Sequence, residues 1–206
     1  MSDDAAAATS EPSEPSARPE LSPTLDRLRV HVDEHSVKLG EFTLKSGATS
    51  SWFLDTKQTA CRPDGILLVA DAIVEVFGDD LDGIDAIGGL TMGADPMAYG
   101  VAAVLATRGH HLRSFSVRKE AKQGGIAGRI AGALQPGDRV LVTEDTTTRG
   151  TSLIEAVDEI AAFGAEPVSM SVIVDRGGTC AAMAAERGID YRPLLTAPDL
   201  GFGFGT

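Results

Sequence analysis

Two patterns of apolar residues alternate along this chain, one typical of amphipathic helices and one typical of short buried strands. Apolar residues at helical spacing predict helices over residues 25–37, 62–77, 95–107, 153–164 and 179–187. Short apolar runs between turn residues predict strands over residues 85–89, 114–117, 140–142, 167–174 and 191–195. Because strands and helices alternate and the strands are apolar on both sides, we predict an α/β fold with a parallel sheet and helices on both faces.

Two further strands are predicted near the N-terminus, outside this alternation. Residues 41–47 and 51–55 flank a turn at residues 46–49, and we expect them to form a small N-terminal cap. Residues 1–20 are mainly Ala, Ser, Pro and acidic residues, which predicts a disordered acidic tail. Residues 21–206 are expected to form a single domain, because their number fits one hydrophobic core.

The segment 139–152 contains the most informative polar residues. Glu144 and Asp145 follow the apolar run Val140–Val142 after a single Thr, and a turn rich in Thr, Ser and Gly then leads into a predicted helix. Backbone N–H groups and the helix dipole attract an anion at such a junction. Further donors are the hydroxyls of Thr147, Thr148, Thr151 and Ser152. Because the two acids suit sugar hydroxyls, the segment predicts a sugar-phosphate site; the alternative is an ordinary connection whose turn caps the helix.

Charged residues and glycines follow other predicted strands as well. Gly88–Gly89, Arg118–Lys119 and Asp175–Arg176 all lie at strand ends, and the carboxyl ends of parallel strands meet at one edge of a sheet. Six of the 18 Lys and Arg residues lie close together in the sequence: Arg108, Arg113, Arg118, Lys119, Lys122 and Arg129. This segment predicts a mobile cationic loop that closes over an anionic ligand; the alternative is a solvated surface loop.

Charge and composition narrow the class of protein. The formal net charge of −12 argues against nucleic acid or an anionic membrane surface as a partner. No apolar run approaches the length of a membrane span and no basic leader precedes one, so we expect a cytoplasmic protein. Cys61 and Cys180 have no metal-binding or redox spacing, and we interpret them as two isolated thiols.

Five motifs together resemble the orotate phosphoribosyltransferases, a family of type I phosphoribosyltransferases, over roughly residues 42–200. The motifs, in the family's order, are residues 42–47, 88–96, 117–122, 140–152 and 175–176. The resemblance implies transfer of a phosphoribosyl group from phosphoribosyl pyrophosphate (PRPP) to N1 of orotate in pyrimidine biosynthesis, with release of pyrophosphate. It also implies Mg²⁺ carried by PRPP rather than by a protein metal site, and a homodimer whose catalytic loop is shared between subunits.

The same resemblance assigns roles to individual residues. Lys119, Lys122 and Asp145 are implied to be catalytic, because charges of fixed position stabilise the charge that develops as pyrophosphate leaves. The implied PRPP-binding residues are Arg118, Lys119, Lys122, Glu144, Asp145, Thr146, Thr147, Thr148, Arg149, Gly150, Thr151 and Ser152. The implied orotate-binding residues are Lys45, Phe53, Thr148 and Arg176, of which the planar Arg fork suits the carboxylate of orotate.

Two positions depart from the family pattern. Gly124 stands where the family loop usually has a His, and Arg149 stands where the family generally has a small residue. We therefore consider two alternative functions in addition to phosphoribosyl transfer to orotate. One is a PRPP-dependent paralogue that acts on another base, and the other is a regulatory protein that senses PRPP without turnover.

Overall fold

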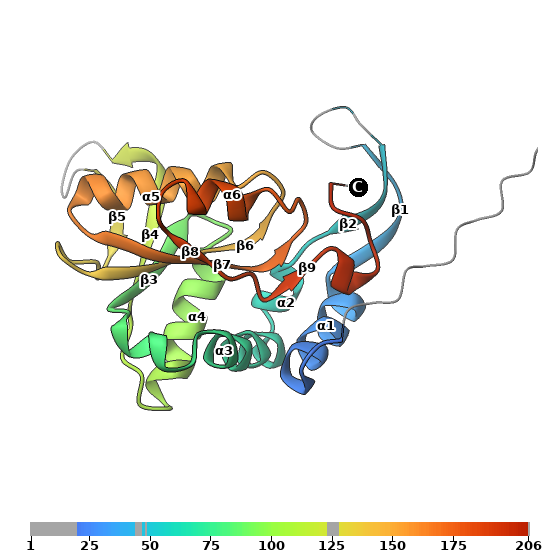
Figure 1. The fold of residues 1–206 in the computed structure, drawn as a ribbon, viewed down its shortest axis with the longest axis horizontal. Coiled ribbons are helices and arrows are strands. Elements are labelled where there is room, and N and C mark those ends of the chain that lie inside the picture. Colours follow the sequence, from blue (N-terminus) through green and yellow to red (C-terminus); the bar gives the residue numbers. More distant parts are fainter. Residues whose placement is uncertain (1–19, 44–46, 48, 123–127, 206) are drawn as a thin grey trace, which may run out of the picture.

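The computed structural model describes residues 20–43, 47, 49–122 and 128–205. The tail predicted for residues 1–20 therefore lies almost entirely outside the described residues, as do Lys45 and Gly124. The described part contains a central sheet, helices on both sides of it and a separate two-stranded sheet (Figure 1).

A sheet of seven strands forms the centre of the molecule. The strand order is β5-β4-β3-β6-β7-β8, and β9 also pairs with β7. Every pair is parallel except β4 with β5, so the predicted, largely parallel sheet is confirmed. The bounds are β3 Ala86–Leu90, β4 Arg113–Lys122, β5 Gly128–Gly132, β6 Arg139–Thr147, β7 Glu166–Asp175, β8 Asp190–Tyr191 and β9 Leu195–Thr196.

Helices cover both faces of this sheet, as predicted (Figure 1). One face is covered by α5 (Thr151–Phe163) and α6 (Cys180–Ala185). The other is covered by α4 (Asp95–Ala106), with α3 (Pro63–Phe77) and α1 (Pro23–His35) packed beside it.

The two helical layers enclose two separate hydrophobic clusters. Successive residues of a strand point to opposite faces, so Ile87 belongs to the cluster beneath α3 and α4 while its neighbour Ala86 belongs to the cluster beneath α5. The same division separates Leu141 from Val140 and Val142 in β6. This two-sided burial explains why the strands have continuous rather than alternating apolar sequences.

Several differences from the predicted elements have a physical cause. The strand predicted at 140–142 continues to Thr147, and the strand predicted at 114–117 continues to Lys122 and pairs with β5. The described part of the cationic segment therefore lies largely in two paired strands, because backbone pairing extends past the apolar residues that periodicity detects; the predicted loop at residues 123–127 lies outside the described residues. The strand predicted at 191–195 is divided into β8 and β9 around Pro193, which has no N–H for the ladder.

The predicted cap is confirmed as an antiparallel pair, β1 (Val37–Thr43) and β2 (Thr49–Leu54). Its inward-facing Trp52 is fully buried and stacks on Phe202 near the C-terminus, with ring centroids 4.0 Å apart and planes 4° apart. The cap is therefore fastened to the main domain by the last residues of the chain. A four-residue helix, α2 (Lys57–Ala60), follows the cap and was not predicted.

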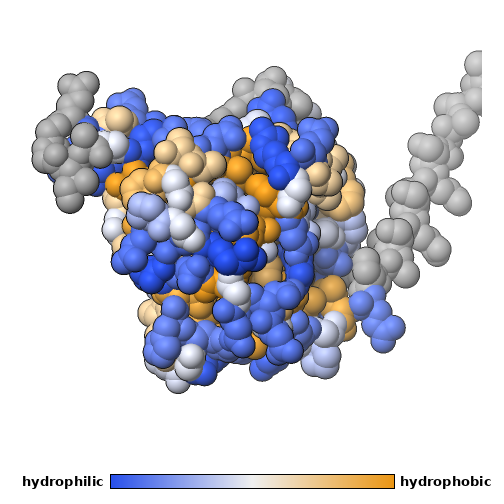
Figure 2. All heavy atoms as spheres, turned by 60° about the vertical axis from the view of Figure 1, so that its left-hand side comes forward, coloured by the Kyte–Doolittle hydropathy of each residue, from blue (hydrophilic) through white to orange (hydrophobic). Residues whose placement is uncertain are grey.

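The face of the molecule seen in Figure 2 is mainly polar. Figure 2 shows a largely hydrophilic face with small hydrophobic areas between the charged side chains. No helix in the described part of the chain is long and apolar enough to cross a membrane.

We predict that Leu141→Ala lowers the free energy of unfolding by about 2–5 kcal/mol, because it leaves a cavity at the centre of the sheet. Leu141 has an exposed fraction of 0%. The matched control is Leu39→Ala in the cap, where the side chain is 76% exposed and its loss should change stability by less than about 0.5 kcal/mol. Urea unfolding measures both; equal effects of the two variants would contradict the packing described.

Candidate active site

The site lies where the strand order changes direction. From β3 the chain continues to β4 on one side, and β6 lies on the other side of β3. In open α/β sheets such a point leaves a crevice beyond the carboxyl ends of the two central strands. The turn that follows β3 contains Gly93, and the end of β6 contains Glu144 and Asp145.

Both carboxylates are buried, with exposed fractions of 7% for Glu144 and 3% for Asp145. They lie against the backbone of Gly93, where an added Cβ would overlap Glu144 Oε1 and lie 2.7 Å from Asp145 Oδ1. Only glycine fits between the turn and the two acids. Asp95 holds the turn after β3 in place, because it accepts hydrogen bonds from Thr91 Oγ1 and Ser116 Oγ, each at 2.6 Å.

Two residues that the sequence did not single out hold Asp145. Lys57 Nζ donates a hydrogen bond to Asp145 Oδ2 at 2.6 Å, and Thr56 Oγ1 donates to the same oxygen at 3.1 Å. Both come from the start of α2, which is too short for helical periodicity to detect. The available signal was their position, since they directly follow the strand predicted at residues 51–55.

The protonation of the acidic pair follows from its surroundings. Burial, and then the charge of Asp145, raise the pKa of Glu144 to about 8. Burial opposes the charge on Lys57, but its hydrogen bond to Asp145 and the charge of Asp145 outweigh this and raise the pKa of Lys57. At neutral pH Glu144 therefore mostly holds a proton, and the charge of Asp145 is balanced by Lys57. The pair repels an approaching phosphate much less than two free carboxylates would.

The turn between β6 and α5 is open to an anion. Gly150 is the N-cap residue of α5, lies in the left-handed region (φ +75°) and, as a glycine, has no side chain to cap the helix. The exposed residues Thr148 and Thr151 and the half-buried Ser152 place hydroxyls beside the start of the helix. This is the arrangement that the sequence predicted for a phosphate. Arg149 is also exposed on this turn.

Two of the implied PRPP-binding residues, Thr146 and Thr147, use their hydroxyls within the fold. Thr147 Oγ1 accepts a hydrogen bond from the Gly150 N–H at 2.9 Å, and Thr146 Oγ1 donates to the Val174 carbonyl at 3.0 Å. Their hydroxyls therefore shape the turn and the end of the sheet. Gly177, after β7, packs so closely against the Thr148 carbonyl that an added Cβ would overlap it.

Arg176 lies between the end of β7 and the cap. Its guanidinium carbon is 4.2 Å from the Trp52 ring centroid, and Nη2 donates to Ser50 Oγ at 3.1 Å. The guanidinium is thus held flat on an aromatic face at the edge of the site. Its neighbour Asp175 accepts hydrogen bonds from the N–H groups of Gly177 and Gly178, each at 2.9 Å, and therefore shapes the loop.

The structure does not bring Phe53 to Arg176. Phe53 follows Trp52 in β2, so its side chain points to the opposite face of the cap sheet. It is partly exposed and packs on Phe42, with ring centroids 5.6 Å apart. Any contact between Phe53 and a base beside Arg176 is therefore disfavoured by strand alternation.

The cationic residues of the predicted loop divide into two groups. Arg108 pairs with Asp71, Arg113 with Asp138, and Arg129 with two glutamates of α5, so these three stabilise the fold. Lys119 and Lys122 are exposed and form no ion pair with the described residues, while Arg118 donates to the Gly128 carbonyl at 3.5 Å.

The lysine-bearing hairpin lies away from the acidic pair. The far end of β4 and β5 is at the upper left of Figure 1, whereas the cap and α2, which carries Lys57, are at the right. Among the described residues, no hydrogen bond or ion pair joins Lys119 or Lys122 to the Lys57–Asp145 pair.

Comparison with known proteins identifies the family. A model of the phosphoribosyl transferase domain matches residues 58–183. The orotate phosphoribosyltransferase of Streptomyces avermitilis is 38% identical over 175 residues, which cover 84% of this chain and 95% of that protein. The chain belongs to the orotate phosphoribosyltransferase family. The resemblance given by the five motifs is thereby confirmed.

Solved structures of orotate phosphoribosyltransferases have the same fold. That of Mycobacterium tuberculosis in complex with Fe(III) dicitrate superposes with a TM-score of 0.78 at 34% identity, covering 87% of this chain and all of the other. The same enzyme in complex with PRPP gives a TM-score of 0.73 at 31% identity and the same coverage. The type I phosphoribosyltransferase-like fold predicted from the sequence is therefore confirmed.

We predict that Glu144→Gln stabilises the protein more at high pH than at low pH. Because the folded-state pKa of about 8 lies above the ordinary 4.5, the folded wild type binds the extra proton and loses stability as pH rises through this window. Glutamine is neutral throughout and avoids that loss. The melting temperature of the variant relative to wild type should increase between about pH 5 and about pH 8.5. The raised pKa of Glu144 would be contradicted if the difference in melting temperature did not change with pH, or if the exposed control Glu41→Gln showed the same trend.

Proposed function

We propose that this protein transfers the phosphoribosyl group of PRPP to N1 of orotate, giving orotidine 5′-monophosphate and pyrophosphate in pyrimidine biosynthesis. The observation that carries the proposal is the direct succession of a buried acidic pair and an open helix N-terminus at the end of β6. The family relationship supports the same reaction. We place it in the cytoplasm, which is consistent with Cys61 and Cys180 being free thiols.

The PRPP site follows from the geometry of the turn. The 5′-phosphate would bind to the first N–H groups of α5 and to the hydroxyls of Thr148, Thr151 and Ser152. The ribose hydroxyls would then lie at Glu144 and Asp145. A proton on Glu144 allows it to donate one hydrogen bond, while an oxygen of Asp145 accepts another.

Asp145 is the group best placed to assist the chemistry. As the bond between the anomeric carbon and the pyrophosphate oxygen breaks, its electron pair leaves with pyrophosphate and positive charge develops on the ribose. A carboxylate held in a fixed position by Lys57 and Thr56 stabilises that charge without reorganising. N1 of orotate then forms the new bond to the anomeric carbon with its electron pair, and the proton that N1 carried is released to the departing pyrophosphate or to water.

The leaving pyrophosphate needs cations that the same chain does not bring to the site. We propose that Lys119 and Lys122, with Arg118, reach the neighbouring subunit's site in a homodimer. The position of the hairpin supports this, since its end lies opposite the cap in Figure 1. Large apolar side chains exposed on the α3–α4 side offer surface for such a dimer: Leu67, Met92 and Tyr99.

The donor set fits Mg²⁺ that arrives with PRPP. Mg²⁺ prefers oxygen ligands and usually binds one or two carboxylates together with substrate phosphates. Glu144 and Asp145 are the carboxylates at the proposed PRPP site, and the ion would neutralise charge on the diphosphate.

Arg176 is the residue best suited to recognise the base. Trp52 and Ser50 fix its orientation, and Ser50 also lines a cleft with a volume of about 480 Å³ along the cap hairpin. A guanidinium fixed in one plane recognises a planar carboxylate, which orotate has and uracil lacks. Gly124, in place of the usual loop His, favours the alternatives of a different base or of PRPP sensing without turnover.

We predict loss of the orotate absorbance band when protein, Mg²⁺, PRPP and orotate are mixed, with release of one pyrophosphate for each orotate consumed. Arg176→Lys should reduce turnover of orotate at least tenfold, because Lys cannot form the planar two-point contact. Turnover of uracil or a purine without turnover of orotate would establish the paralogue. Binding of PRPP without pyrophosphate release from any base would establish the sensor.

We predict that mixing two inactive variants restores activity. Lys122→Ala has a defective hairpin and a sound acidic pair, whereas Asp145→Ala has the reverse. If the hairpin acts in the neighbouring subunit, each mixed dimer has one site with neither defect. At equal amounts about half of the dimers are mixed, so roughly a quarter of the wild-type activity returns. Subunit exchange is verified by tagging one variant; no recovery in proven mixed dimers would show that the hairpin serves its own chain.

A further inference from the structure

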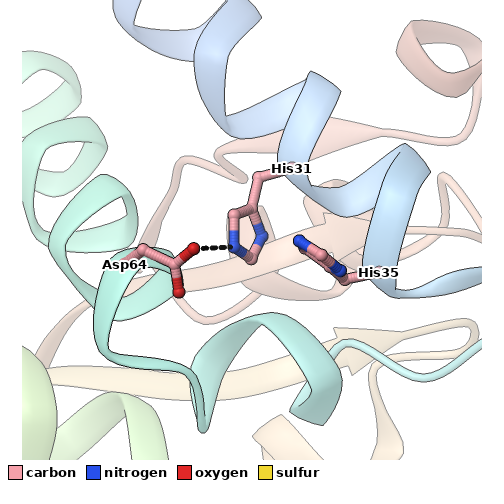
Figure 3. Close-up of side chains that lie close together, drawn as sticks. All are labelled: His31, His35 and Asp64. Atoms are coloured by element: carbon pink, nitrogen blue, oxygen red, sulfur yellow. Dashed lines mark ion pairs between the residues drawn. The ribbon is translucent and has the colours of Figure 1, made fainter.

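Two histidines and one aspartate converge between α1 and α3, outside the proposed active site (Figure 3). His31 and His35 are four residues apart on α1 and therefore share a face, and Asp64 is the second residue of α3. One ligand atom from each residue lies within 4.8 Å of those of the other two. None of the three belongs to the motifs that define the family resemblance.

His31 is the buried centre of this cluster, with an exposed fraction of 7%. Its Nδ1 lies 3.2 Å from Thr59 Oγ1, which itself lies 2.7 Å from Ser36 Oγ. Its Nε2 has no hydrogen-bond partner, although Asp64 Oδ2 lies 3.4 Å away. A histidine that binds a metal through one ring nitrogen usually has its other ring nitrogen held by a hydrogen-bond partner, as Thr59 holds Nδ1 of His31 here.

The packing around His31 is specific to this arrangement. A Cβ on Gly65 would lie 2.8 Å from His31 Cε1, so glycine at the start of α3 allows the ring to lie against the helix. The backbone N–H of Asp64 itself, and then that of Gly65, hold the carboxylate and lower the pKa of Asp64. Burial, and then His35, lower the pKa of His31, while Asp64 raises it and Arg62 lowers it.

We propose that His31 Nε2, His35 and Asp64 bind one divalent transition-metal ion, best matched by Zn²⁺, which links α1 to α3. Two imidazoles and one carboxylate suit Zn²⁺, whereas Mg²⁺ and Ca²⁺ prefer ligand sets of oxygen alone. Zn²⁺ holds such ligands at about 2.0–2.2 Å, so the three atoms must approach slightly. Asp64 is exposed and His35 is partly exposed, so both can move while His31 stays fixed.

Water can complete the coordination of the ion. The cluster borders a cleft with a volume of about 500 Å³, lined by both histidines, Asp64 and neighbouring residues of α1 and α3. Glu34 lies 3.9 Å from His35 Nε2 and adds negative charge beside the site. Through Thr59 the ion would also fix α2, the helix that carries Lys57. Its primary role would be to hold α1 and α2 against α3.

The experiment titrates untagged, chelator-treated protein with ZnCl₂ in a calorimeter, without PRPP or Mg²⁺, and measures zinc retained after gel filtration. We expect one Zn²⁺ per chain and a higher melting temperature. His35→Ala and Asp64→Asn should each weaken zinc binding at least tenfold, because loss even of outer partners costs that much. His31 is left intact, because its replacement would leave a cavity in the core.

Two matched variants control for other zinc ligands. His110→Ala removes a histidine that pairs with a single carboxylate, since its Nδ1 lies 3.5 Å from Asp82 Oδ1. This pair is not part of a three-residue cluster among the described residues. Cys61→Ser removes an exposed thiol near Asp64 in the sequence. Both should bind zinc as wild type does, and metal-free circular dichroism should show all variants folded. No retained zinc in the wild type, equal affinity in all variants, or loss of binding only in a control variant would overturn the proposal.

Discussion

The site depends on keeping two adjacent carboxylates out of water at the end of β6. Burying charge is costly unless it is paired, hydrogen bonded or neutralised. Here Asp145 receives hydrogen bonds from Lys57 and Thr56, while Glu144 retains a proton over much of the neutral range. The pair therefore requires α2 and the turn at Gly93 to be in place. The acidic site is therefore complete only when both segments are packed against the end of β6.

Arg176 provides the second connection between the cap and the main domain. It joins the end of β7 to β2 through Trp52 and Ser50, and Trp52 in turn stacks on Phe202. Residues far apart in the sequence thus meet at one point beside the site. In the proposed reaction, the base would therefore be bound by a residue that the cap holds in place, Arg176. The ribose would be bound by the acidic pair, which α2 holds in place through Asp145. The cluster at His31 would secure α2 from the side of α1.

The two proposals differ in how they relate to these connections. Phosphoribosyl transfer uses the crevice between β3 and β6, where the strand order reverses and the backbone leaves room for a ligand. The proposed zinc site uses the contact between α1 and α3, where the buried nitrogen of His31 is directed at Asp64 and His35 supplies the third ligand. Its ligands are distinct from Glu144, Asp145 and the turn before α5. Failure of one proposal would therefore leave the other standing.

The sequence by itself determined the alternation of strands and helices, the limits of α3, the acidic pair and the open turn before α5. These depend on local features: apolar periodicity, a proline at a helix start, and residue types within one short segment. Tertiary structure alone decided that Lys57 meets Asp145 and that Phe53 faces away from Arg176. It also decided that β4 and β5 pair within the cationic segment. The convergence of His31, His35 and Asp64 likewise depends on how distant helices pack. The reason is physical: periodicity reports which side of an element is buried, whereas these contacts depend on which distant element it is buried against.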